Sequence, residues 1–396
     1  MSESTERAAE CWPPTRDAAL ARLALVRPDA YARTRNHLEG AVTGLSPYIT
    51  HGILRVREVL ALLRERHALQ GSHALVRELG WREYFRHAWR HDGDGIFRSR
   101  HPGPLPDDAY AREMPADIAA GATGLAVIDR AVHTLHATGL LHNHARLWLA
   151  SYIVHLRKVH WLVGAEWLYA QLLDGDLASN HLSWQWVAGT ASSKPYLFNA
   201  DNVARFAPTA WHVPGTVLDM TYAELERVAG DAGWVAPTGR RDVAVPATTF
   251  AAPPDAPDFV PPDPRRIDGM DVRLVHPWAL DDVPPGSHAV AVLDRDFHAR
   301  HRWSARRWAF VTARLRALAP VRFIGSAASL VQALRAARRV EGIADPHLDR
   351  AFDALPLSPD LPAFGEPGSR LPSFSAWWKR AALPASIVPS TPLPST

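Results

Sequence analysis

Apolar residues recur every three or four positions through most of the first 206 residues, which is the spacing of an amphipathic helix. This pattern predicts helices after Pro13 within residues 1–30, from residue 46 to about 63, over 76–89 and from 124 to 167. Residues 91–118, rich in Gly, Pro and Asp, are predicted to form a loop. We therefore expect the first half of the chain to be helical.

Residues 213–270 break the helical pattern, because prolines crowd among Ala, Asp and Thr from Pro237 onward. Such a composition is typical of a semi-extended connection between domains. The segment is predicted to be a mobile linker that begins with one short helix around Tyr222–Val228.

Beyond the linker, short apolar runs alternate with helical patterns. Strands are predicted at 272–275, 288–294 and 321–325, and helices at 303–318 and 328–339. This alternation indicates a small α/β, doubly wound (Rossmann-like) parallel sheet, without the glycine fingerprint of a dinucleotide loop. The predicted two-domain architecture is an all-α domain over 1–212, a linker over 213–270 and an α/β domain over 271–396.

The composition narrows the class of protein. A length of 396 residues suits two domains, and a hydrophobic content of 47% is ordinary for globular proteins. The single cysteine, Cys11, excludes a disulfide framework and a cysteine-ligated cluster. The N-terminus lacks the apolar run of a signal peptide, and no window has the apolar length of a membrane span. We expect a soluble, cytoplasmic protein with no membrane partner.

Charge and aromatic content leave two kinds of function open. The formal net charge is +3, the isoelectric point is about 9.2 and there are 20 histidines, which permits nucleic-acid binding without proving it. Fifteen tryptophans stand against eight tyrosines. Core packing accounts for many of these indoles, but the excess indicates stacking or electron transfer as well.

The densest chemistry lies in residues 171–186, which read QLLDGDLASNHLSWQW. A buried carboxylate must find hydrogen-bond donors, and a buried indole N–H needs an acceptor. The stretch is therefore either a surface loop or the wall of a pocket for a flat, polar, partly aromatic ligand, and we favour the pocket. Its candidate binding groups are Asp174, Asp176, Asn180, Trp184 and Trp186.

A second candidate binding segment runs from Thr43 to Pro47. Small hydroxyl residues followed by proline predict a helix start with a hydroxyl cap and proline at the first helical position. Free N–H groups at such a helix start also suit a phosphate, although most caps of this kind bind no ligand.

Two other polar groupings have plain explanations. Glu78 and Arg82 are four apart and suit an exposed helix pair, although Trp81 lies on the same side. His142 and His144 are two apart and do not share a helix face, and no neighbouring residue completes a zinc spacing. We therefore predict no metal site.

Four separated motifs resemble the flavin-binding helical domain of the DNA photolyase and cryptochrome family over residues 31–206, and they occur in that family's order. The motifs are VTGLSPY (42–48), RELGWREYFRH (77–87), TGLLHNHAR (138–146) and LLDGDLASNHLSWQW (172–186). Four motifs in register are far more specific than any one of them.

The resemblance implies that the helical domain binds FAD. It implies that the Thr43–Ser46 segment holds the diphosphate and that Asn180 lies opposite the flavin nitrogen that exchanges a proton. An asparagine there suits a reduced, anionic flavin, because an amide adds no competing charge. The implied cofactor-binding residues are Tyr31, Thr43, Gly44, Leu45, Ser46, Arg82, Asn143, Arg146, Asp174, Asp176 and Asn180.

The resemblance also implies a substrate, ultraviolet-damaged DNA. Trp81 and Trp186 match the two aromatic residues that hold a flipped-out lesion, and Glu78 matches the carboxylate that binds the pyrimidine pair. This set is similar to that of enzymes that split cyclobutane dimers by electron transfer from excited reduced FAD. The histidine pair of the (6-4) branch is not found. Cationic groups expected to meet DNA phosphates are Arg82, Arg86 and Lys194.

The family's tryptophan wire for flavin photoreduction is matched in part. Trp184 and Trp161 match its inner and middle members. No tryptophan lies between residue 89 and Gly124, where the outer member is expected, so Trp148, Trp167 or Trp89 substitutes for it or the wire ends early.

Several features depart from the family pattern. Leu140, His144 and Val42 replace the usual Trp, Arg and Thr. The order of domains also differs, because residues 288–315 and 371–381 resemble parts of the α/β antenna domain that normally comes first. We therefore predict a circularly permuted photolyase. Whether its antenna domain carries a second chromophore, and which one, stays open.

Three functions are consistent with these sequence features to different degrees. The first is repair of cyclobutane pyrimidine dimers by a deoxyribodipyrimidine photolyase, which Glu78, Trp81 and Trp186 favour. The second is a blue-light photoreceptor of cryptochrome type with little or no repair. The third, a flavin-free helical protein, is disfavoured because an empty pocket would leave its polar groups poorly satisfied. Protein partners and oligomeric state are left open.

Overall fold

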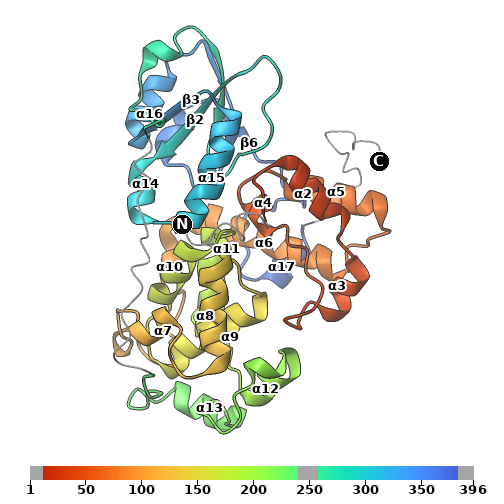
Figure 1. Cartoon of the computed structure of the whole chain (residues 1–396), viewed down its shortest axis with the longest axis vertical. Helices are drawn as coiled ribbons and strands as arrows, with labels where there is room; N and C mark the ends of the chain where they lie inside the picture. The colour runs from red at the N-terminus through yellow and green to blue at the C-terminus, as the bar shows by residue number, and fades with distance from the viewer. Residues whose placement is uncertain (1–11, 240–252, 254–256, 382–396) are drawn as a thin grey trace. The chain divides into compact units, whose positions relative to one another are not determined.

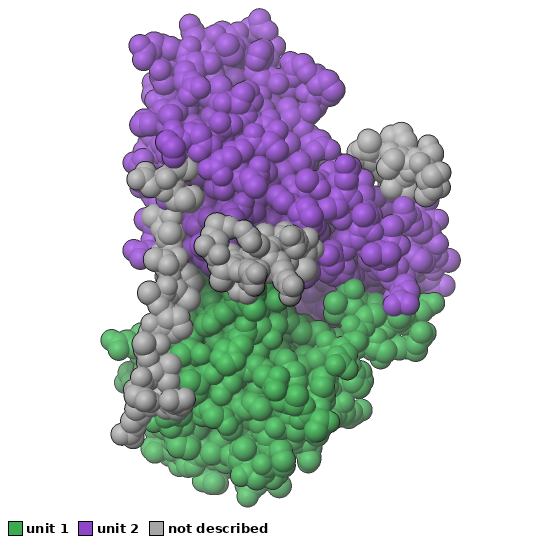
Figure 2. Space-filling model, viewed as in Figure 1, with its two compact units in different colours: residues 1–8, 29–42, 92–249 green, residues 9–28, 43–91, 250–396 purple. Residues whose placement is uncertain are grey.

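The computed structural model describes residues 12–239, 253 and 257–381, and their contacts divide the chain into two compact units (Figure 2). In the described part, unit 1 holds residues 29–42 and 92–239, and unit 2 holds 12–28, 43–91, 253 and 257–381. The predicted domain boundaries at 212 and 270 mark changes in sequence pattern and stay a prediction. Cys11 and much of the predicted linker lie outside the described residues.

Unit 1 is helical, as predicted. Its helices are α3 (Pro28–Thr34), α7 (Ala116–Ala120), α8 (Ala126–Thr138), α9 (Asn143–Ser151), α10 (Trp161–Gln171), α11 (Leu177–Ala188), α12 (Ala200–Phe206) and α13 (Tyr222–Ala229). Short turns of other helix types lie at Gly93–Phe97, Asp107–Ala109, Tyr152–Leu156 and Thr209–Trp211. The short helix expected around residues 222–228 is confirmed as α13.

The core of unit 1 surrounds α10 and α11. Both helices are apolar on nearly all sides, which is typical of helices buried in an interior. The side chains of His160 and Asp176 accept hydrogen bonds from the first turns of α10 and α11, and α11 ends at Gly189 with a φ of 75°. These end signals place a short connection between two helices that pack against α9.

Unit 2 begins with α2 (Arg16–Ala24), α4 (Ser46–Thr50), α5 (Val56–Arg66) and α6 (Ala74–Asp92). The continuous helix predicted from 46 to about 63 is wrong, because the chain breaks between α4 and α5. At Gly52 φ is 63°, and a Cβ there would lie 2.4 Å from the carbonyl oxygen of Trp278. The turn therefore needs glycine for both its backbone angle and its close packing.

The predicted parallel sheet is confirmed in unit 2 (Figure 1). The strands β1 (Asp271–Val275), β2 (His288–Asp294), β3 (Val321–Gly325) and β4 (Arg339–Glu341) pair in the order β3-β2-β1-β4, all parallel. The connections through α15 (Ala305–Leu318) and α16 (Ala327–Leu334) cross the sheet in opposite directions. Right-handed crossovers therefore place these two helices on opposite faces of the sheet.

Three details of the sheet region differ from prediction. Helix α16 ends at Leu334, and β4 begins at Arg339, the last residue of the helix predicted over 328–339. Helix α14 (Arg295–Arg300) precedes α15. Within the segment predicted as linker, Val260 pairs with Phe323 at the edge of β3, because its apolar side chain covers the sheet.

The remaining described elements are a two-stranded sheet of β5 (Ile343–Ala344) and β6 (Ser358–Pro359), 3-10 turns at Pro264–Arg266 and Arg350–Ala354, and α17 (Phe374–Trp378). Leu25 follows α2 as its C-cap and is 79% exposed. Among the described residues, none of the helices combines the length and apolar character that crossing a membrane requires.

Candidate functional site

Asn180 lies on the contact between α10 and α11. Its Nδ2 donates to the carbonyl oxygen of Ala165 at 2.8 Å, and the residue is 7% exposed. One turn further along α11, Trp184 packs so closely on Gly164 that a Cβ there would lie 2.3 Å from the indole. Trp161 is three residues before Gly164 on the same face of α10. The structure therefore brings three predicted residues onto one helix contact.

Asp174 and Arg146 form a two-pronged ion pair. Arg146 Nη2 donates to both carboxylate oxygens of Asp174 at 2.9 and 2.8 Å, and its Nε donates to the carbonyl of Leu141. The Asp174 side chain is only 4% exposed. Bonds of this charged type are stronger than neutral ones, so the pair fixes the loop before α11 relative to α9.

Asp176 serves as the N-cap of α11, where its Oδ1 accepts from the N–H of Ser179 at 2.9 Å. The hydroxyl of Ser179 is itself buried and finds no hydrogen-bond partner among the described residues. A buried hydroxyl beside a carboxylate and an amide costs free energy unless a polar ligand satisfies it. This group of residues therefore fits a polar cofactor such as FAD.

The predicted residues at the start of α9 are close together. Asn143 is exposed at its first position, and His142 is the N-cap, with Nδ1 accepting from His144 N at 3.2 Å. The expectation that the two histidines point apart is wrong: their rings stack at 6.1 Å, because His142 is not yet helical. Burial lowers the pKa of His142 to about 4, so it is neutral near pH 7.

The predicted wire residues are buried. Trp161 and Trp184 are each 2% exposed, and Trp161 Nε1 donates to Ser99 Oγ at 3.0 Å. Among the candidates for the outer member in unit 1, Trp148 is fully buried and donates to Asn202, whereas Trp167 is half-buried at the surface of the core. Of these two, Trp167 is the better placed to exchange electrons with solvent.

Trp186 differs from Trp184, the other tryptophan of α11, because 42% of it is exposed. Its ring lies 5.5 Å from that of Tyr196, tilted by 31°. Lys194, predicted to meet DNA phosphates, is exposed in the loop that follows α11. An open indole and an exposed cation eight residues apart in sequence have the composition of a nucleic-acid contact.

The predicted phosphate segment lies in unit 2. Thr43 Oγ1 accepts from the N–H of Leu45 at 3.3 Å, and Gly44 has a φ of 63°. The predicted cap is corrected: Leu45 is the N-cap of α4 and makes no side-chain cap bond, while Ser46 and Pro47 form the first turn. Because α4 has only five residues, its dipole contributes little, and anion binding here must rely on individual hydroxyl and N–H groups.

Helix α6 positions the predicted lesion residues of unit 2. Glu78 is exposed and Trp81 is half-buried. Arg82 is half-buried one turn beyond Glu78, and Tyr31 is half-buried in α3 of unit 1. Arg86 is 8% exposed, and its guanidinium pairs with Asp345 at 3.0 Å, which favours a structural role over a phosphate contact.

Sequence reasoning missed two residues on or against α6. Glu83 is buried beside Arg86, at 7% exposed, and burial raises its pKa to about 7. Phe374 of α17 stacks on Trp81 with ring centres 4.0 Å apart and planes 10° apart. The one signal for it in the sequence is the aromatic cluster within 371–381, the segment that resembles part of the antenna domain.

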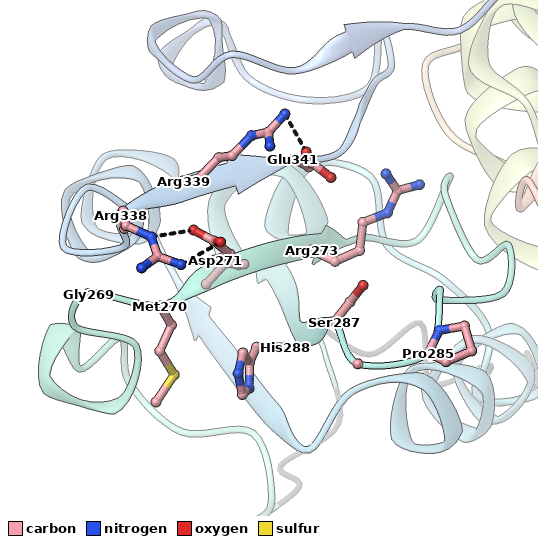
Figure 3. A pocket seen from close by; sticks show the side chains of 12 residues that line it. Gly269, Met270, Asp271, Arg273, Pro285, Ser287, His288, Arg338, Arg339 and Glu341 are labelled. Atoms are coloured by element: carbon pink, nitrogen blue, oxygen red, sulfur yellow. Dashed lines mark hydrogen bonds and ion pairs between the residues drawn. The ribbon is translucent and has the colours of Figure 1, made fainter.

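A pocket of about 510 Å³ lies in the α/β part of unit 2, at the amino ends of β1, β2 and β4 (Figure 3). All three arginines that line it are ion-paired: Arg338 with Asp271, Arg339 with Glu341 and Arg273 with Asp281. Ligands of doubly wound sheets bind beyond the carboxyl ends of the strands, so this pocket is at the opposite edge. None of the predicted site residues lines it.

The chain was compared with known proteins. The family described as "FAD binding domain of DNA photolyase" matches residues 75–210. The deoxyribodipyrimidine photo-lyase of Streptomyces griseus is 36% identical over 155 residues, covering 38% of this chain and 33% of that protein. Cryptochrome DASH of Idiomarina loihiensis is 34% identical over 170 residues, covering 41% and 38%. The chain thus spans less than half the length of these two relatives.

Among solved structures, the cryptochrome of Synechocystis is 27% identical with a TM-score of 0.44, covering 48% of this chain and 43% of that one. The family match contains α6 and the α10–α11 contact, including Trp81, Asn180 and Trp184. The chain therefore carries the FAD-binding domain of the photolyase and cryptochrome family at residues 75–210, and a parallel α/β sheet follows this domain in the sequence.

Proposed function

We propose that this protein is a light-dependent DNA repair enzyme that splits cyclobutane pyrimidine dimers. The observation that supports this most directly is the exposure of Trp186, 42%, on a helix whose other tryptophan is 2% exposed. An exposed indole lacks the stabilisation that burial would give it. A flipped-out base that stacks on the indole would supply such a contact.

In unit 1, the residues proposed to hold FAD are the Arg146–Asp174 pair, Asn143, Asp176 and Asn180. When bound, reduced and photoexcited, FAD would lend one electron to the dimer and take it back once the cyclobutane ring has opened. Because Asn180 Nδ2 is held by Ala165, its Oδ1 is left to meet the ligand. An acceptor oxygen there suits a protonated ring nitrogen, as in the reduced cofactor.

Glu78 and Trp81 are proposed to bind the lesion together. They are three residues apart on α6 and therefore project from the same side of the helix. The exposed carboxylate of Glu78 can accept hydrogen bonds from pyrimidine N–H groups, while Trp81 provides a ring face.

DNA binding is proposed to use exposed cations, with Lys194 as the clearest candidate. Arg86 is removed from the proposed phosphate contacts because Asp345 neutralises it inside the protein. If phosphates carry the affinity, the logarithm of the binding constant falls linearly with the logarithm of the salt concentration. A binding constant that does not change with salt would exclude DNA as the ligand.

The test is repair of an oligonucleotide that contains one thymine dimer, with purified protein and its flavin chemically reduced. Repair under blue light and not in darkness is expected. The Trp186→Ala variant should bind FAD normally but repair poorly, and Trp167→Phe, outside the lesion contacts, should repair like the parent protein. A parent protein that binds FAD and repairs neither single- nor double-stranded substrate would refute the proposal.

The second candidate is a cryptochrome-type photoreceptor. It is kept because cryptochrome DASH of Idiomarina loihiensis matches this chain almost as well as the Streptomyces photolyase does, at 34% against 36% identity. For this function, blue light should change the flavin redox state and the protein's protease sensitivity without repairing DNA. The proposed circular permutation of the antenna domain is compatible with either function.

A further inference from the structure

Helix α17 covers one face of α6. The residues it meets are spaced three or four apart, so they form a single stripe along α6. Arg77 lies over the rings of Phe374 and Trp378 at 5.5 and 5.6 Å. Gly80 lies beneath Trp378, where a Cβ would come within 2.3 Å of the indole. The missing side chain at Gly80 therefore allows the two helices to approach closely.

Phe374 is the centre of this contact. It is 4% exposed and stacks on Trp81 at 4.0 Å, with 10° between the ring planes. Tyr84 meets its edge at 6.0 Å, and Trp378 stacks beside it at 5.4 Å. A ring enclosed in this way has little rotational freedom, so it presents a fixed surface to Trp81.

The chain before α17 is tied to the same helix. His87 Nδ1 and Arg90 Nη2 each lie 2.5 Å from the carboxylate of Glu366, and Leu371 N–H donates to His87 Nε2 at 3.2 Å. Since Nε2 of His87 accepts a hydrogen bond, Nδ1 carries the ring proton and donates it in a hydrogen bond to the Glu366 carboxylate. His87, His91 and Glu366 include metal-ligand atom types. Arg90 competes with any metal ion for the Glu366 carboxylate, and both ring nitrogens of His87 already have partners. We therefore interpret this group as an ion pair that ties the chain before α17 to α6, and not as a metal site.

From these contacts we infer that Phe374 is a positioning residue for lesion binding: it stacks on one face of Trp81 and so fixes this partly exposed indole, on which a flipped-out pyrimidine dimer would stack. This inference rests on the proposed function. An indole on a helix surface would otherwise sample several rotamers, and ordering it when the ligand binds would cost affinity. The segment of residues 364–378 therefore acts as a support for the lesion site on α6.

The test compares Phe374→Ala, Phe374→Leu and Phe374→Tyr by their affinity for dimer-containing and undamaged oligonucleotides. The affinity of the alanine variant for the dimer should fall about tenfold, which corresponds to the contribution of one stacked base to binding. Its FAD content and affinity for undamaged DNA should not change. The tyrosine variant should restore dimer affinity, and the leucine variant should not.

The matched control is Phe259→Ala. Phe259 is also buried, at 7% exposed, in unit 2, and also lies under an arginine, Arg316, at 5.8 Å. It should leave dimer affinity unchanged. The inference is overturned if Phe374→Ala binds the dimer within twofold of the parent protein. It is also overturned if the variant binds more tightly, because that result would mean that α17 blocks the site. Neither result would contradict the proposed repair function.

A second readout separates this inference from the proposed function. Fluorotryptophan labelling, with the Trp81 resonance assigned through Trp81→Phe, reports the order of this indole without DNA. Phe374→Ala should broaden or shift that resonance. If the parent protein fails to recognise dimers, the proposed function fails. An unchanged Trp81 resonance in Phe374→Ala would then overturn the positioning role independently.

Discussion

At the scale of single residues, the Arg146–Asp174 pair gives the sharpest test of the flavin site. Asp174→Asn keeps the side-chain shape but removes the charge that two Arg146 contacts use. Because bonds to a charged group contribute about 1.5–3 kcal/mol, we expect FAD binding to weaken about tenfold or more. The measurement is the ratio of flavin to protein absorbance after purification, followed by titration of the apoprotein with FAD.

The matched control for that variant is Asp271→Asn. Asp271 also pairs with an arginine through two contacts, to Arg338, but this pair is exposed and belongs to the sheet of unit 2. It should retain FAD like the parent protein. A yellow Asp174→Asn protein with parental affinity would remove Asp174 from the flavin site.

Gly164→Ala tests the contact between α10 and α11. The new methyl group would lie 2.3 Å from the Trp184 ring, so the indole or the helices must move. We expect a loss of about 1–3 kcal/mol in the free energy of unfolding, from overpacking, and slower flavin photoreduction. Urea denaturation and the rate of flavin bleaching under blue light measure the two effects.

Gly368→Ala is the corresponding control, because nothing lies within 4 Å of its added methyl group. It should be neutral in both measurements. Parental photoreduction in Gly164→Ala, together with reduced stability, would show that Trp184 packs in the core without carrying electrons.

At the scale of elements, periodicity predicted most helices and three strands of the main sheet correctly. Their pattern of burial follows directly from local sequence, as in β2, where six of seven residues are buried. The break at Gly52 and the short strand β4 were missed. Both depend on partners distant in sequence: the Trp278 carbonyl for Gly52 and β1 for β4. Local pattern carries no information on such partners.

The site shows the same limit. Motifs identified Asn180, Asp174 and Trp81 by residue type and spacing, and the structure gives Asn180 and Asp174 specific partners within unit 1. The role of Phe374 was not predicted, because nothing near residue 374 in the sequence indicates that α17 packs on α6. Arg86 was predicted to meet DNA, but its partner Asp345 could not be foreseen from either segment alone.

The buried pair of Asp117 and Arg157 is expected to hold the segment around Gly239 in place. Arg157 donates to both Asp117 oxygens at 2.8 and 3.0 Å, and the N–H of Gly239 donates to the same carboxylate. Asp117→Asn leaves a buried guanidinium without its counter-charge, so we expect a loss of about 3–5 kcal/mol in the free energy of unfolding. Differential scanning calorimetry measures it.

Asp263→Asn is the control for this element, since Asp263 pairs with Arg265 at the surface and surface pairs contribute little. It should melt like the parent protein. If Asp117→Asn does so as well, water reaches Arg157 and the pair does not anchor the segment around Gly239.

At the scale of the whole molecule, buried histidines should make stability depend on pH. Burial lowers the pKa of His155, His181 and His276 to about 4, against about 6.5 in an unfolded chain. Between these values the unfolded chain binds more protons than the folded one. The free energy of unfolding therefore falls as pH falls from about 6.5 to about 4.

Urea denaturation at a series of pH values across that window measures this slope. His276 explains it structurally, because Nδ1 accepts from Trp278 N–H while Nε2 donates to the Ile343 carbonyl, so only the neutral ring fits. His181→Asn, which can keep a donor toward Leu177, should flatten the slope. A stability that stays constant from pH 6.5 to 4 would contradict the assignment.

Unit 2 joins residues that leave the ribosome far apart in time. Arg55, Arg86 and His87 lie in its early segments, and their partners Asp281, Asp345 and Glu366 are translated much later. Most of unit 1, residues 92–239, is translated in between as one continuous stretch and can fold at once. Throughout that interval α6 has its aromatic stripe uncovered, because α17 has not yet been made. Production of the folded protein should therefore depend on chaperones that shield α6 during synthesis.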